Sequence, residues 1–152
     1  MKKYLIILLT FGMFFVTGCG NSSGTLTCTK TEMSEDGYST NTTMVVTYAD
    51  KIVTKVEQTS IEEMEADFVD TSIYFSQLLA ESLNEVDGYN ITFEKENDMA
   101  VRIVTTIDYT VLDSEKIKET LGSSYKEDAL YSLSNITIED FKETQLDGYT
   151  CK

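Results

Sequence analysis

The sequence predicts an α+β domain in which an antiparallel five-stranded sheet is covered on one face by helices. Two observations support this fold class. Residues 25–60 and 89–109 alternate apolar and polar side chains with the period of two that is typical of half-buried strands, whereas residues 60–86 and 113–145 show helical spacing. The order β-β-β-α-β-β-α-α, with strands that are apolar on one side, favours a single sheet with helices on its apolar face.

The first three strands are expected to form a meander within residues 25–60. Threonine, valine and tyrosine, which suit a pleated surface, dominate this part of the chain. The alternation breaks at residues 34–37 and at Ala49-Asp50, so we expect hairpin turns there.

The next element is expected to be the longest helix. Ser60-Ile61-Glu62-Glu63 has the pattern of a capping box, which predicts a helix that starts at Ser60, and Asp87-Gly88 is the expected end. A stripe with helical spacing is expected to be its apolar face. The stripe consists of Ile61, Met64, Phe68, Phe75, Leu79, Leu83 and Val86.

The remaining chain predicts a hairpin followed by helices. Tyr89, Ile91 and Phe93 lie on one side of the first strand, Asn97-Asp98 is the expected turn, and residues 99–109 alternate strictly. Asp113 or Ser114 is placed to cap the helix that follows, and a second capping box over residues 124–127 precedes another apolar segment. That segment carries Ala129, Leu130 and Leu133, and a last short helix is expected from its cap at Thr137 to Gly148.

The N-terminus predicts a bacterial secretion signal over residues 1–18. Lys2 and Lys3 precede a mostly apolar run over residues 4–16, which is too short for a comfortable permanent membrane span. Val16-Thr17-Gly18-Cys19 looks like a lipobox, the motif at which bacterial lipoproteins receive a diacylglyceryl group and are cleaved. We therefore expect cleavage between Gly18 and Cys19 and a lipid on Cys19. An ordinary cleaved signal or a buried cysteine is the alternative.

This signal defines the expected domain organisation and location. The small polar residues 19–24 predict a flexible tether from the lipidated cysteine, and residues 25–152 suit one α+β domain. The lipid on Cys19 is expected to hold that domain on a cell membrane, facing outside the cytoplasm.

The charge balance excludes one class of partner. The chain has 12 basic and 26 acidic residues, a net charge of −14, and loss of Lys2 and Lys3 with the signal makes the balance more acidic. A strongly acidic domain repels phosphate backbones and anionic headgroups. We expect no nucleic-acid partner and no electrostatic adhesion to a membrane.

Two cysteines remain besides Cys19, one near each end of the domain. Cys28 and Cys151 are a candidate disulfide, because such bonds persist outside the cytosol and the number of remaining cysteines is even. Two unpaired thiols are the alternative.

The residues give no indication of a catalytic centre, metal site or cofactor. There is no histidine, and no nucleotide-binding or hydrolase motif is present. The acidic turns do not reproduce a calcium-binding loop, so we expect no metal ligand set. An enzymatic function would require several carboxylates with shifted pKa values that converge in a cleft.

Several segments together resemble a known family. These segments are Val16-Thr17-Gly18-Cys19, the threonine-rich stretch with Cys28, residues 43–48 and 51–56, the long acidic helix, and Gly148-Tyr149-Thr150-Cys151. This layout resembles the YehR-like family of small bacterial lipoproteins, a domain of unknown function. The resemblance implies an α+β fold and lipid anchoring, and it supplies no catalytic residue.

The expected function is a non-enzymatic, lipid-anchored module that binds a protein or a small ligand at the cell envelope. The alternative is a structural or accessory subunit of a membrane protein complex. A broad pocket favours a small ligand, whereas an exposed apolar patch favours a partner protein.

Overall fold

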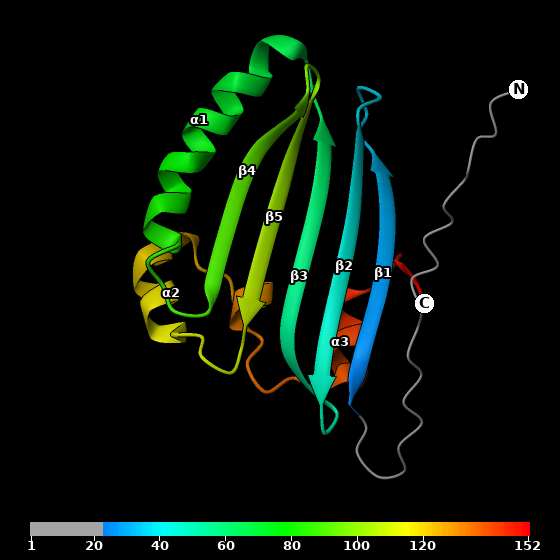
Figure 1. Ribbon diagram of the computed structural model, residues 1–152, viewed down its shortest axis with the longest axis vertical. Helices are drawn as coiled ribbons and strands as arrows, with labels where there is room; N and C mark the ends of the chain where they lie inside the picture. Colours follow the sequence, from blue (N-terminus) through cyan, green and yellow to red (C-terminus); the bar gives the residue numbers. More distant parts are fainter. Residues whose placement is uncertain (1–22) are drawn as a thin grey trace, which may run out of the picture.

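Six antiparallel strands form one sheet in the order β4-β5-β3-β2-β1-β6 (Figure 1). The computed structural model describes residues 23–152, so the expected signal peptide and the lipidation site at Cys19 lie outside the described residues. The strands are β1 (Gly24–Met33), β2 (Ser39–Ala49), β3 (Ile52–Glu63), β4 (Tyr89–Asn97), β5 (Ala100–Asp108) and β6 (Thr150–Cys151). Gly24, expected in the tether, is the first residue of β1.

The α+β class and the antiparallel sheet are confirmed, but the expected number of five strands is wrong. The sixth strand, β6, pairs with Cys28 and Thr29 at the edge of the sheet. Because β6 contains two residues, it has no period that a sequence pattern can reveal. Its position depends on a contact with β1, more than a hundred residues earlier in the chain.

One face of the sheet is apolar and the other is polar, as the alternation predicts. On β2, Thr42, Met44 and Val46 are buried, whereas Asn41 and Thr43, which alternate with them, are exposed. Val56 of β3 pairs with both Val46 and Ile107, so the buried side continues across the central strands. Ile138, Phe141 and Leu146 of the C-terminal segment pack on this apolar face.

The helices α1 (Ala66–Leu83), α2 (Ser114–Leu121) and α3 (Ile138–Gln145) occupy two regions of the fold. Figure 1 shows α1 and α2 beside the β4–β5 hairpin, and α3 next to β1 and β2. The main apolar cluster lies beneath α3 and combines strand and helix residues. It consists of Cys28, Met44, Val46, Val53, Val56, Ile138, Phe141 and Leu146.

The expected helix start at Ser60 is wrong, because β3 continues to Glu63. Ser60 pairs with Thr42 and Ile103 on the neighbouring strands, and its hydroxyl lies 3.2 Å from the hydroxyl of Thr42. The hydroxyl of Ser60 therefore has a hydrogen-bond partner on the neighbouring strand. The local capping pattern cannot reveal this partner, because it lies far away in the sequence. The helix begins at Ala66 without a side-chain cap.

The second expected capping box is also wrong, whereas two other caps are confirmed. Gly122, with φ of 50°, ends α2, and residues 122–133 contain only two short 3₁₀ turns, η1 (Gly122–Ser124) and η2 (Leu130–Ser132). Asp113 caps α2 by accepting from the backbone N–H of Lys116, and Thr137 caps α3 by accepting from that of Asp140.

A disulfide joins Cys28 of β1 to Cys151 of β6, which is the pairing expected from the sequence. The two residues face each other in register across these antiparallel strands. The bond closes a sequence separation of 123 residues, so it attaches the C-terminal segment to the first strand.

Candidate interaction surface on helix α1

Helix α1 is apolar on two sides. Val69, Ala80 and Leu83 are buried against the rest of the fold. Successive residues of an α-helix are rotated by about 100°, which places another set of large side chains on the side that faces away. We call this set the α1 apolar patch, and its exposed fractions are Phe68 59%, Tyr74 61%, Phe75 65%, Leu78 48% and Leu79 57%.

The expectation that Phe68, Phe75 and Leu79 lie on the core side of this helix is wrong. Within residues 23–152, eight large apolar side chains are exposed, and five of them belong to the α1 apolar patch. Periodicity detects an apolar side of a helix, but it cannot choose between two such sides. The smaller residues Val69 and Ala80 lie at the interface between α1 and the sheet. The spacing of Val69, Ala80 and Leu83 along the helix is the sequence pattern that corresponds to the buried side.

Polar side chains on α1 and at its C-terminal end form hydrogen bonds with the backbone of β4. Asn84, which follows the helix, accepts a hydrogen bond from the N–H of Ile91 at 2.7 Å and donates one to its carbonyl at 2.9 Å. Gln77 donates to the carbonyl of Phe93 at 3.4 Å. These contacts satisfy backbone groups on the exposed edge of β4, an edge that otherwise attracts another strand. They turn the α1 apolar patch toward solvent.

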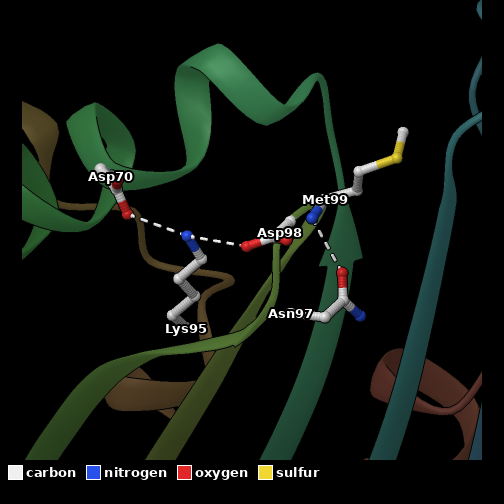
Figure 2. Close-up of polar contacts among 5 residues, drawn as sticks. All are labelled: Asp70, Lys95, Asn97, Asp98 and Met99. Atoms are coloured by element: carbon white, nitrogen blue, oxygen red, sulfur yellow. Dashed lines mark hydrogen bonds and ion pairs between the residues drawn. The ribbon is translucent and has the colours of Figure 1, made fainter.

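Two ion pairs of Lys95 connect the N-terminal half of α1 to the β4–β5 turn. Figure 2 shows the ammonium of Lys95 between two carboxylates, 3.5 Å from Asp70 of α1 and 3.2 Å from Asp98 of the turn. The hydrogen bond with Asp98, followed by the charge of Asp70, raises the pKa of Lys95. In the same turn, Asn97 accepts from the N–H of Met99 at 2.8 Å. Because all three side chains are exposed, these ion pairs contribute little stability.

The surroundings of the α1 apolar patch are acidic. No lysine or arginine lies between Lys55 and Lys95, a range that contains the whole helix. Asp67, Asp70 and Glu81 belong to α1 itself, and Glu65 and Glu85 lie next to its ends. Two cations lie near the helix in the fold: Lys95 is paired with Asp70 and Asp98, and Lys116 of α2 donates to the carbonyl of Glu85 at 2.6 Å.

A shallow hollow lies between α1 and β4. It is lined by Gln77, Ala80, Glu81, Asn84 and residues 91–94, and it is open to solvent. A small-molecule site is usually concave and mostly apolar, and it encloses most of its ligand. The hollow lacks that enclosure, so the exposed helix is the more prominent surface feature.

Two carboxylates, Glu63 and Glu96, have lowered pKa values, and each is bound by a different partner. The backbone N–H of Ser39 donates to Glu63 and lowers the pKa of that carboxyl, and the guanidinium of Arg102 lowers the pKa of Glu96 at 2.6 Å. Across residues 23–152, no three acidic, cysteine or histidine side chains are grouped as metal ligation requires. In the same range, no helix has the length and hydrophobicity needed to cross a membrane.

Comparisons with known proteins support the fold. No family model and no curated protein matches the sequence. An NMR structure of a protein from Streptococcus pneumoniae TIGR4 is similar, with a TM-score of 0.59 and 13% identity over 100% of this chain and 99% of that one. The NMR structure of Escherichia coli YehR is also similar, with a TM-score of 0.59 and 13% identity over 86% of this chain and 92% of that one. The chain therefore has a YehR-like fold.

Proposed function

We propose that this protein is a lipid-anchored module that binds a partner protein at the cell envelope through the α1 apolar patch. The observation that carries the proposal is the exposure of five large apolar side chains on one helix. Soluble surfaces rarely gather such residues, and where they do the patch usually marks an interaction site. Aromatic residues, three of which are present here, are enriched at protein interfaces.

Lipid anchoring is the second part of the proposal and rests on the lipobox at residues 16–19. A diacylglyceryl group on Cys19 keeps the domain at a membrane, where its partner has to be reached within the length of the tether. Confinement of this kind raises the effective concentration of a membrane partner, so a contact of modest area is sufficient. The alternative, an accessory subunit, corresponds to a partner that is itself a stable membrane complex.

Photocrosslinking from the patch tests the partner. The full chain is expressed with its own signal, and a benzophenone amino acid replaces Leu78 in one version and Thr43, on the exposed face of the sheet, in a matched version. We expect a discrete adduct with an envelope protein from position 78 and none from position 43. Equal labelling from both positions, or no adduct from position 78, contradicts binding through α1.

Fatty-acid labelling tests the anchor separately. Cys19→Ala is expected to abolish incorporation of labelled fatty acid and to leave the signal peptide uncleaved, which a larger band on a denaturing gel reports. If the Cys19→Ala protein is still labelled with fatty acid, the assignment of the lipidation site is wrong.

A further inference from the structure

We infer that the partner segment recognised by the α1 apolar patch is an amphipathic helix whose apolar side is flanked by lysine or arginine. This inference rests on the proposed function and specifies the chemistry of the partner. It follows from the shape of the patch and from the charge around it.

The shape of the patch suits a helix. Side chains four residues apart form ridges on a helix surface, and α1 presents two neighbouring ridges of this kind. One ridge contains Phe75 and Leu79, and the other contains Tyr74 and Leu78. The rings of Tyr74 and Phe75 meet edge to face at 5.6 Å, which joins the two ridges at their N-terminal end. The groove between two such ridges receives the side chains of a second helix laid alongside.

The extent of the patch limits the length of this contact. Each ridge is short, since Thr71 precedes Phe75 and Ser82 follows Leu78 at the four-residue step, and Phe68 extends the patch by about two turns toward the N-terminus. Between Phe68 and Leu79 the helix rises by about 17 Å, which corresponds to about three turns. A partner helix with apolar residues at three- and four-residue spacing over three turns matches this length.

The charge of the region selects a basic partner and disfavours two other occupants. Glu65, Asp67 and Glu81 lie on or beside α1 and form no ion pair within residues 23–152, whereas Asp70 is already paired with Lys95. Lysine or arginine beside the apolar stripe of the partner complements these carboxylates. A second copy of this chain carries the same acidic helix and a net charge of −14, so like charges oppose self-association. An anionic lipid surface is repelled for the same reason.

Designed peptides provide the test. The acylated protein is placed in phosphatidylcholine nanodiscs, with empty nanodiscs as the blank. The probe is an 18-residue helical peptide, equal in length to α1, with leucine at three- and four-residue spacing, lysine on both flanks and a single tryptophan. Because this protein contains no tryptophan, the fluorescence of the peptide reports binding directly. A peptide with glutamate in place of lysine and one with scrambled spacing are the controls.

We expect the lysine peptide to bind about tenfold or more tightly than either control, and its affinity to fall as salt is added. Phe75→Asp should weaken the affinity for the lysine peptide by about tenfold or more, because the substitution removes an apolar contact and binding would desolvate the new carboxylate. Ser134→Asp, an exposed loop change of equal charge away from α1, should leave the affinity unaltered. Circular dichroism of both variants verifies that they fold.

Each alternative occupant gives a distinct result. If the glutamate peptide binds as tightly as the lysine peptide, the inference that the partner is basic is wrong. If the scrambled peptide binds as tightly, the inference that the partner is an amphipathic helix is wrong. A self-adduct from position 78 identifies a second copy instead, and stronger retention on nanodiscs with anionic lipid identifies a membrane. If photocrosslinking from position 78 still yields an envelope protein, the proposed function survives the failure of this inference.

Discussion

Helices α1 and α3 contact the same sheet in different ways: α3 packs on its apolar face, whereas α1 lies along the edge strand β4. α3 directs Ile138 and Phe141 into the main apolar cluster, and both are buried, whereas its other side is polar. α1 buries small or medium side chains and exposes its largest ones. Both helices have apolar residues at helical spacing. Those of α3 are buried and stabilise the fold, whereas the largest ones of α1 are exposed to solvent. The difference separates a region that holds the fold together from a region that is free to bind.

The largest expected effect lies on the α3 side, at the disulfide. Cys151→Ser should lower the free energy of unfolding by about 5 kcal/mol in the chain-entropy model, because a very long loop is no longer closed in the unfolded state. Urea unfolding of the variant and of reduced wild type measures this loss. A change below about 1 kcal/mol in both samples contradicts a stabilising role of the disulfide.

Phe141 should have the next largest effect. Its side chain is 0% exposed within the cluster beneath α3, so Phe141→Ala leaves a cavity and should cost about 3–5 kcal/mol. Equilibrium unfolding in urea measures this, and Phe141→Leu, which fills most of the space, is the milder control. A loss under about 1 kcal/mol contradicts the role of this side chain in the core.

Alkaline pH should also act on the α3 side. Tyr109 packs against the cluster, donates to the carbonyl of Leu130 at 2.6 Å, and has a pKa that burial raises. The unfolded tyrosine loses its proton near pH 10, before the folded one does. Stability is therefore complete below that pH and falls above it by up to about 1.4 kcal/mol for each pH unit.

Tyr109→Phe provides the control for this prediction, because phenylalanine has no proton to lose. The variant should show a smaller alkaline decline of the unfolding midpoint than wild type. Identical declines indicate that other groups cause the loss of stability.

The smallest effect on stability is expected on the α1 side. Phe75 is 65% exposed, so Phe75→Ser should change the free energy of unfolding by about 0.5 kcal/mol or less, while it weakens the labelling from position 78. The same urea series and the crosslinking yield measure both quantities. A large destabilisation shows that Phe75 belongs to the core, and the contrast between the two helices then fails.

Local patterns were sufficient for much of the architecture and insufficient for the candidate surface. The alternation in residues 89–109 predicted the β4–β5 hairpin because period two depends only on neighbouring residues. The caps at Asp113 and Thr137 were predictable for the same reason. Ser60 satisfies its hydroxyl across the sheet, so its local sequence indicated a helix where the chain continues as a strand.

The sequence by itself determined the α+β class, the polar and apolar faces of the sheet, the candidate disulfide and the acidic character of the domain. Only the tertiary structure decided that β6 joins the edge of the sheet and that α1 turns Phe68, Phe75 and Leu79 outward. The physical reason is that both outcomes depend on contacts between distant segments. Cys151 meets Cys28, and Asn84 bonds the edge of β4, so the side of α1 that faces the sheet is chosen by its partners and not by its own periodicity.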